Sequence, residues 1–117
     1  MQLDQRIVGD VVVVKVGGEI TVKGGDVILK DKINSLLQQG YRKLVLDLGD
    51  VPYVDSSGLG QLAAAHATAA RQGGTLKLLN VTKRLNDLLV VTRLLLVFDT
   101  YESEAEALAS FAKGAGL

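Results

Sequence analysis

The stretch of sequence that decides the fold is KLVLDLGDVPYVDSSGLG, residues 43–60. Its first six residues, KLVLDL, are rich in leucine and valine, which predicts a central strand. A helix is predicted to begin near Ser57 and to end at Arg71, because Gly73-Gly74 follows after Gln72. The stretch therefore joins a strand to a helix through a short loop.

The residues before this stretch predict a hairpin and a helix. Val11–Val16 (VVVVKV) is a β-branched run that predicts a buried strand. Gln5–Val8 is expected to pair with it as an edge strand, with Gly9-Asp10 as the turn. Further along, Asp26 is expected to cap a helix that runs to about Gln39 and has four aliphatic residues on one face. These residues are Leu29, Ile33, Leu36 and Leu37.

The residues after it continue the alternation of strands and helices. Thr75–Leu79 (TLKLL) predicts a strand, Thr82 is expected to cap a short helix, and Leu95–Phe98 predicts a final strand. Ser103 and Glu106 have the spacing of a capping box at the start of a last helix. A strand pair followed by alternating helices and strands favours one α/β domain over residues 1–117. Its sheet is expected to be mixed, mostly parallel, with about five strands starting with a hairpin and about four covering helices.

Composition argues against several classes of function. The chain has 13 basic and 13 acidic side chains, and no block of like charge stands out. Aromatic residues are also few, whereas a nucleic-acid-binding protein usually has a basic stripe, often with stacking aromatics. It has no cysteine and one histidine, so few of the usual metal ligands are present. The first ten residues do not resemble a signal peptide, and the longest apolar runs are too short to span a membrane. We therefore expect a cytoplasmic protein with no membrane insertion.

Asp55, Ser56 and Ser57 are placed in the turn where the predicted helix begins. The first amides of a helix have no intrahelical acceptor, and the positive end of the helix dipole lies there, so the turn favours an anion such as a phosphate on Ser56. Asp and Ser are also the commonest helix N-caps. The spacing alone leaves an ordinary cap and an anion site open.

The motif VDSSGLG, residues 54–60, placed after a strand ending in LDL, closely resembles the phosphorylation-site motif of bacterial anti-sigma factor antagonists of the STAS domain family. Residues 18–20 (GEI) and 98–111 (FDTYESEAEALASF) are similar to two further parts of that family. The resemblance implies a single STAS-like domain with Ser56 as the phosphoacceptor. It also implies that three neighbouring residues shape the site: Asp55, Ser57 and Gly58. Thr21 stands beside this loop where the family often has an aspartate.

The resemblance also implies a mechanism of partner switching. The unphosphorylated protein is expected to bind an anti-sigma factor that is also an ATP-dependent serine kinase, which frees the sigma factor. Phosphorylation of Ser56 would end the complex, and a metal-dependent serine phosphatase would reset it. The chain itself is expected to be neither an enzyme nor a cofactor-binding protein.

The predicted second helix is expected to carry part of the docking surface, because it adjoins Ser56. The residues expected on its exposed face are Gln61, Ala64, Ala65 and Thr68. The residues expected on its buried face are Leu59, Leu62, Ala63, His66, Ala67 and Ala70.

Three other functions compete with this one. A serine-nucleophile enzyme is disfavoured because His66 lies ten residues after Ser56 on the same helix, roughly 15 Å away at 1.5 Å per residue, and no G-x-S-x-G elbow is present. Nucleotide binding is disfavoured because the Gly17-Gly18 and Gly24-Gly25 pairs form no complete phosphate-binding motif. A STAS scaffold or transporter-associated subunit without a sigma-factor role remains the alternative.

Overall fold

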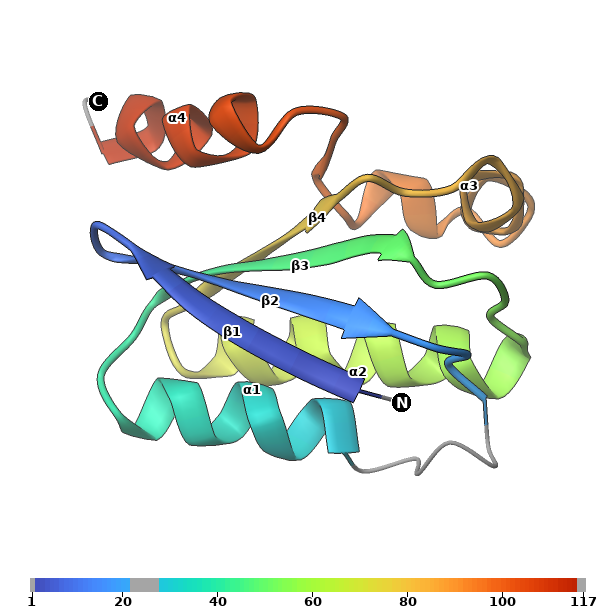
Figure 1. Ribbon diagram of the computed structural model, residues 1–117, viewed down its shortest axis with the longest axis horizontal. Helices are drawn as coiled ribbons and strands as arrows, with labels where there is room; N and C mark the ends of the chain where they lie inside the picture. The colour runs from blue at the N-terminus through green and yellow to red at the C-terminus, as the bar shows by residue number, and fades with distance from the viewer. Residues whose placement is uncertain (1, 22–27, 116–117) are drawn as a thin grey trace.

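The computed structural model of the chain describes residues 2–21 and 28–115, which form a five-stranded sheet with helices on both faces (Figure 1). The strands follow the order β1-β2-β3-β4-β5, with β1 antiparallel to β2 and every other neighbouring pair parallel. The predicted fold class is confirmed. The elements are β1 (Gln2–Val8), β2 (Val11–Gly17), α1 (Ile28–Gln38), β3 (Lys43–Asp50), α2 (Ser56–Arg71), β4 (Thr75–Leu79), α3 (Lys83–Val91), a 3-10 turn η2 (Leu94–Leu96), β5 (Thr100–Tyr101) and α4 (Glu104–Ala115).

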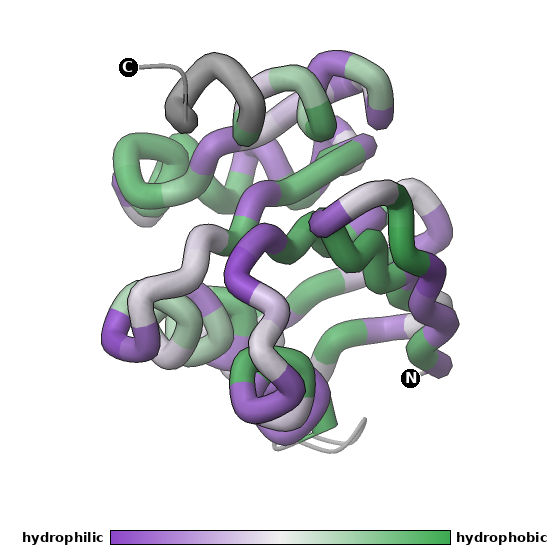
Figure 2. The backbone as a smooth tube through the Cα atoms, turned by 90° about the vertical axis from the view of Figure 1, so that its left-hand side faces the viewer, coloured by the Kyte–Doolittle hydropathy of each residue, from purple (hydrophilic) through white to green (hydrophobic). Residues whose placement is uncertain are grey.

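The sheet separates two hydrophobic clusters. Helices α1 and α2 cover one face and α4 covers the other (Figure 1), and the hydrophobic stretches of the strands run between these layers (Figure 2). Alternate residues of a strand point to opposite faces, so Val12 and Val14 of β2 enter the larger cluster while Val11 and Val13 enter the smaller one beneath α4. The four aliphatic residues predicted on one face of α1 are all buried.

The hairpin at the start of the chain forms as predicted. Gly9 has a φ of 63°, which a residue without a Cβ adopts at low cost, and this turn lets β1 pair with β2 from Val8↔Val11 to Gln2↔Gly17. The first strand is longer than the predicted Gln5–Val8, because the pairing with β2 continues to Gln2.

Two of the predicted helix caps are confirmed in the described residues. The Leu85 amide donates to Thr82 Oγ1 over 3.3 Å, and the Glu106 amide donates to Ser103 Oγ over 3.4 Å. The cap predicted at Asp26 lies outside the described residues. None of the described helices has both the length and the apolar character needed to cross a membrane.

The predicted final strand Leu95–Phe98 is wrong. Arg93 has a left-handed φ of 64° at the end of α3, and the chain then makes the turn η2. The last strand is β5, which lies beside the end of β4, where the Leu78 amide donates to Asp99 O over 2.9 Å. A short aliphatic run does not distinguish a strand from a turn that inserts one side chain into the core. Here Phe98 is buried while Leu96 remains 88% exposed.

We predict that Lys43→Met raises the pKa of the Asp10 carboxyl toward its ordinary value. In the hairpin turn, a hydrogen bond from the Lys43 ammonium lowers the pKa of Asp10. A lowered folded-state pKa favours the folded protein above the unfolded-state pKa, and this contribution disappears as the pH falls through the folded-state value. A carboxyl-carbon NMR titration measures the change. Lys83→Met is the control, because Lys83 pairs with Asp87 on α3 instead, and an equal rise of the Asp10 pKa in both variants would contradict the prediction.

Candidate functional site

The loop between β3 and α2 ends in a capped helix start that exposes two serines. Asp55 is the N-cap of α2, with extended backbone angles, and its Oδ1 accepts a hydrogen bond of 2.7 Å from the Gly58 amide. Ser56 and Ser57 are the first two residues of the helix and are exposed. The helix begins one residue earlier than predicted. The Ser56 hydroxyl thus lies on the surface, at the electropositive end of a 16-residue helix.

This loop is joined to the loop that follows β2. The Ile20 amide donates to Tyr53 O over 3.0 Å, the Asp55 amide donates to Ile20 O over 3.4 Å, and Ile20 and Val54 form a parallel bridge. These bonds pair backbone groups of Ile20 with those of the β3–α2 loop without forming a continuous strand. The two loops therefore hold the start of α2 in one position.

Gly58 allows the helix to approach the neighbouring loop closely. A Cβ at this position would lie 1.7 Å from the carbonyl oxygen of Ile20 and 2.6 Å from its carbon, both of which are backbone atoms. Gly60, one half-turn later on the same helix, has open space at its Cβ position. The glycine of the predicted motif is therefore required at residue 58 by the packing of two main chains.

Thr21 lies beside the first turns of α2, as expected. Its carbonyl oxygen accepts a hydrogen bond of 3.2 Å from Gln61 Nε2, so the Gln61 side chain adds a second link between the β2 loop and α2. The sequence-predicted residues Asp55, Ser56 and Gly58 are thus brought together with Thr21 at one end of the sheet. Thr21 is partly buried.

The predicted exposed face of α2 is largely wrong. Ala64 is exposed, but Gln61, Ala65 and Thr68 are buried. Of the face predicted to be buried, Leu59 and Leu62 are buried, whereas Ala63, His66 and Ala67 are half-buried and Ala70 is exposed.

The physical reason for this error is that α2 packs on α1 as well as on the sheet. A helix with two neighbours buries a face that is rotated toward both of them, and its own hydrophobic pattern does not reveal the second neighbour. The polarity of Gln61 and Thr68 suggested exposure. However, Gln61 donates to the carbonyl oxygen of the partly buried Thr21, and Thr68 Oγ1 accepts a hydrogen bond from Arg71.

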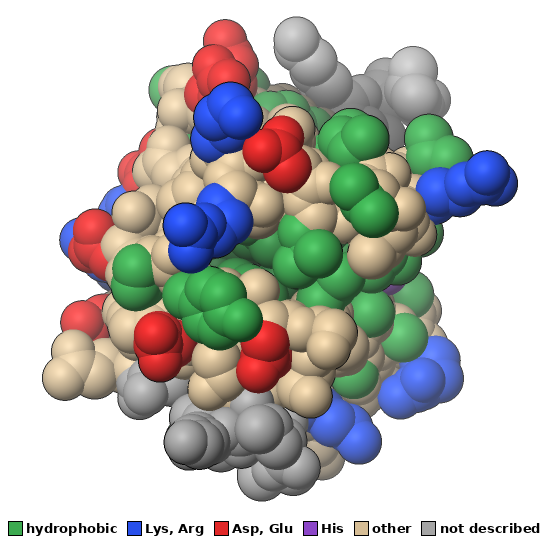
Figure 3. Space-filling model, turned by 90° about the vertical axis from the view of Figure 1, so that its right-hand side faces the viewer, with side chains coloured by type: hydrophobic (Ala, Val, Ile, Leu, Met, Phe, Trp, Pro, Cys, Tyr) green, Lys and Arg blue, Asp and Glu red, His purple; other side chains and the backbone are tan. Residues whose placement is uncertain are grey.

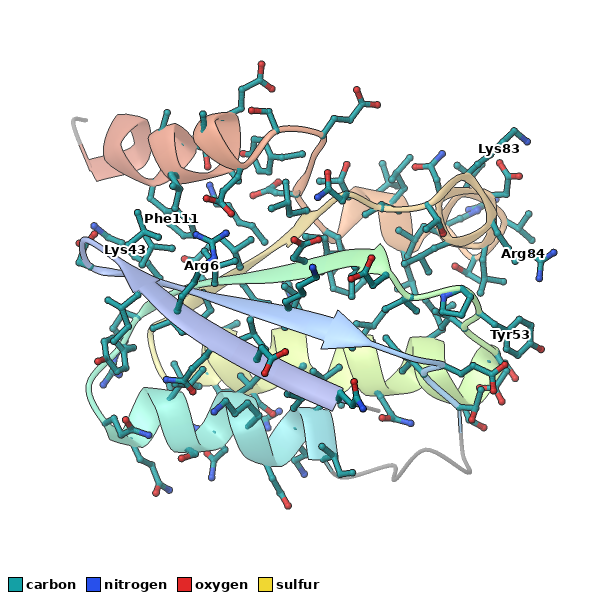
Figure 4. All side chains as sticks on the ribbon, in the orientation of Figure 1. Arg6, Lys43, Tyr53, Lys83, Arg84 and Phe111 are labelled. Atoms are coloured by element: carbon teal, nitrogen blue, oxygen red, sulfur yellow. The ribbon has the colours of Figure 1, made fainter. Side chains whose placement is uncertain are left out.

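Ser56 lies on the rim of a surface hollow of about 510 Å³ between the β3–α2 loop and α3. We call this the Ser56 hollow. Figure 3 shows hydrophobic side chains gathered on this side of the molecule among charged ones, and Figure 4 shows Tyr53 and Arg84 at the same end. Its lining residues are Tyr53, Val54, Asp55, Ser56, Arg84, Asp87, Leu88 and Val91.

Two apolar residues that line the Ser56 hollow are exposed to solvent. Tyr53 is 41% exposed and Val91 is 79% exposed, and both are large enough to bury substantial apolar area against another molecule. The sequence did not predict that α3 lines the Ser56 hollow. Topology gives the signal, because the loops that follow parallel strands meet at the carboxyl edge of the sheet, and α3 follows β4 there.

His66 is part of the packing of α2. Its ring contacts Phe98 edge-on, with 5.2 Å between the ring centroids. Over residues 2–21 and 28–115, no three histidine or acidic side chains gather where they could hold a metal ion.

Comparison with known proteins finds a match to the STAS domain over residues 2–107. The anti-sigma-B factor antagonist of Bacillus subtilis is 40% identical over 86 residues, which are 74% of this chain and 77% of that protein. Among solved structures, an anti-sigma factor antagonist from Mycobacterium paratuberculosis is 25% identical, with a TM-score of 0.80 over 93% of this chain and 92% of that one. The Bacillus protein SpoIIAA in its phosphorylated form is 20% identical, with a TM-score of 0.71 over 94% and 99%, and it shares the fold.

We predict that Gly58→Ala lowers the free energy of unfolding by about 2–3 kcal/mol, because the new methyl group overlaps the Ile20 carbonyl and one backbone segment must move. Gly60→Ala is the matched control on the same helix. There the methyl group meets no atom within 4 Å, and replacing a helical glycine is expected to stabilise by roughly 0.5–1 kcal/mol. Urea unfolding followed by circular dichroism measures both, and equal effects of the two substitutions would contradict the packing argument.

Proposed function

The chain belongs to the STAS domain family, and we propose that it is an anti-sigma factor antagonist whose switch is the hydroxyl of Ser56. The observation that carries the proposal is the position of Ser56, exposed at the first residue of α2 and on the rim of an apolar hollow. A modification there changes the charge of a surface without disturbing the core. The names of the relatives point to the same role.

In its unphosphorylated form, the protein binds an anti-sigma factor, which then releases its sigma factor. The Ser56 hollow is the docking surface in this proposal. Its apolar part, formed by Tyr53, Leu88 and Val91, gives up water-exposed area when the partner binds, and this is the main source of affinity. The exposed guanidinium of Arg84 and the carboxylate of Asp87 give the rim both signs of charge, which orients the partner.

Phosphorylation of Ser56 ends the complex by electrostatics. A phosphate adds about −1.5 to −2 charges at neutral pH. A like charge held about 4 Å away costs around 4 kcal/mol per unit pair at an effective dielectric constant near 20, and each 1.4 kcal/mol is a factor of about ten in affinity. One acidic group of the partner near Ser56 is therefore enough to weaken binding by two orders of magnitude.

The fold is suited to carry this charge. The N-terminal amides of α2 and its dipole favour an anion beside Ser56, while Asp55 continues to cap the Gly58 amide. The two bonded loops hold the helix start whether or not the phosphate is present. The switch therefore needs no large change in backbone conformation.

The chain acts as a substrate in this cycle. The anti-sigma factor is the serine kinase, which uses ATP to phosphorylate Ser56, and a serine phosphatase removes the phosphate. Because the partner controls a sigma factor, we place the protein in the bacterial cytoplasm.

We predict that Ser56→Ala abolishes phosphorylation and keeps the affinity for the kinase within about threefold, whereas Ser56→Asp weakens binding at least tenfold through its negative charge. Mass spectrometry after incubation with the kinase and ATP locates the phosphate, and calorimetry measures the binding. Ser57→Ala is the control, since Ser57 is the exposed neighbour on the same helical turn and its loss should leave phosphorylation intact.

Phosphate on the Ser56→Ala protein at full stoichiometry would refute the assignment. Affinity purification from the native cell gives an independent check. Recovery of an ATP-binding kinase supports the switch, and recovery of a transporter subunit in its place supports the scaffold role.

We predict that Val91→Arg weakens binding of the anti-sigma factor at least tenfold, because a charged side chain then occupies the apolar part of the Ser56 hollow. Ile7→Arg is the matched control, because Ile7 is also an exposed aliphatic residue, 51% open to solvent, but lies on the edge strand β1. Calorimetric titration of both variants with the kinase measures the effect. Equal affinities of the two variants would place the docking surface elsewhere.

A further inference from the structure

Lys77 of β4 is a buried cation that the proposed switch does not use. It is 8% exposed, and its side chain points to the face of the sheet that α4 covers. The ammonium donates to Ser110 Oγ over 2.7 Å and lies 4.4 Å from the ring centroid of Phe111 and 5.4 Å from that of Tyr101. None of the ion pairs formed among the described residues includes Lys77.

This environment leaves the charge only partly compensated. Removing an ammonium from water is costly unless an opposite charge or several hydrogen bonds replace the water. Aromatic faces attract the cation, but this attraction is weaker than that of a carboxylate. Ser110 takes one of the three ammonium donors, and its own hydroxyl donates to Ala107 O over 2.6 Å. The ammonium therefore retains donors for a further acceptor.

Lys77 lines a hollow of about 280 Å³ that we call the basic hollow. Two other cations, Arg42 and Lys43, and two hydroxyl residues, Thr75 and Ser110, line it as well, and none of the described lining residues is acidic. Lys43 shares its charge with Asp10 at the surface. Arg42 uses Nη1 for two backbone carbonyls, which leaves its other N–H groups. The hollow thus combines three cationic side chains, of which Lys43 is paired with Asp10, and the remaining N–H donors of Lys77 and Arg42.

The basic hollow lies at the opposite end of the sheet from Ser56. Arg42 and Lys43 stand at the start of β3 and Thr75 stands at the start of β4, whereas the Ser56 loop follows the end of β3. In Figure 4, Lys43 and Phe111 lie at one end of the molecule and Tyr53 and Arg84 at the other. A ligand in the basic hollow is therefore separate from the phosphate proposed on Ser56.

We propose that the basic hollow binds a small phosphate-bearing anion, with Lys77 as its central ligand. Charge-assisted hydrogen bonds from ammonium, guanidinium and hydroxyl groups are the usual means of phosphate recognition. Pockets for drug-sized ligands measure about 300–1,000 Å³, so a hollow of 280 Å³ fits inorganic phosphate or a phosphate monoester better than a nucleotide. The bound anion is linked to α4 through Lys77, because the Lys77 ammonium also donates to Ser110 Oγ.

An NMR titration with sodium phosphate tests the proposal, with sodium chloride exchanged to hold the ionic strength constant. We expect saturable amide shifts at residues 42–43, 75–77 and 110–111, and slower hydrogen exchange in α4 when phosphate is bound. A second titration, with glycerol 3-phosphate, separates a monoester ligand from free phosphate by its affinity. Shifts that never saturate, or that chloride reproduces, would overturn the proposal.

Lys77→Met is the deciding variant, because methionine keeps an apolar chain over the Phe111 ring while removing the charge. We expect it to weaken phosphate binding at least tenfold. Lys83→Met, which removes an exposed cation from α3, should leave it unchanged. Where Lys77→Met does not fold, Ser110→Ala and Arg42→Gln are the replacements, with the same expected loss. Unchanged phosphate affinity in the folded variants shows that the basic hollow is not the site.

Discussion

The close contact between Gly58 and the Ile20 carbonyl is the constraint on which the rest of the site depends. Helix α2 begins against the backbone of the β2 loop, at a distance that only glycine allows. Asp55 then caps the helix and bonds to the same carbonyl oxygen. With the inner side of the first turn occupied by another main chain, Ser56 is left on the outer side. The exposure of this hydroxyl is thus a result of packing beneath it.

This arrangement favours regulation by charge over regulation by shape. The helix start is held by backbone bonds to a neighbouring loop and by the Gln61 amide, and none of these bonds involves Ser56. In the proposed switch, a phosphate on the hydroxyl meets solvent and helix amides, which the folded state tolerates. In the proposed complex, a partner in the Ser56 hollow displaces the solvent around this phosphate. The same charge is then mild for the protein alone and costly for the complex.

Local signals in the sequence predicted most of the elements, and tertiary contacts account for the failures. The hairpin turn at Gly9 and the cap at Thr82 depend on a few adjacent residues, so they were predictable. The burial of Gln61 depends on α1 and on the β2 loop, which no pattern within α2 reveals. The failed strand at Leu95–Phe98 has the same origin, since the sheet edge, rather than the aliphatic run, decides where β5 pairs. The motif located Ser56, and only the fold showed that α3 completes its surroundings.

Strand β1 leaves one margin of the sheet without a further strand among the described residues. Such a margin can recruit a second chain by backbone pairing, and polar or charged side chains discourage this. Gln2, Asp4, Gln5 and Arg6 supply them along β1, and Arg6 is also tied to Glu104 of α4. A protein that acts by binding its target, as proposed for this chain, must accumulate to a concentration comparable with that of the target. The polar side chains along β1 disfavour pairing between two such margins at that concentration.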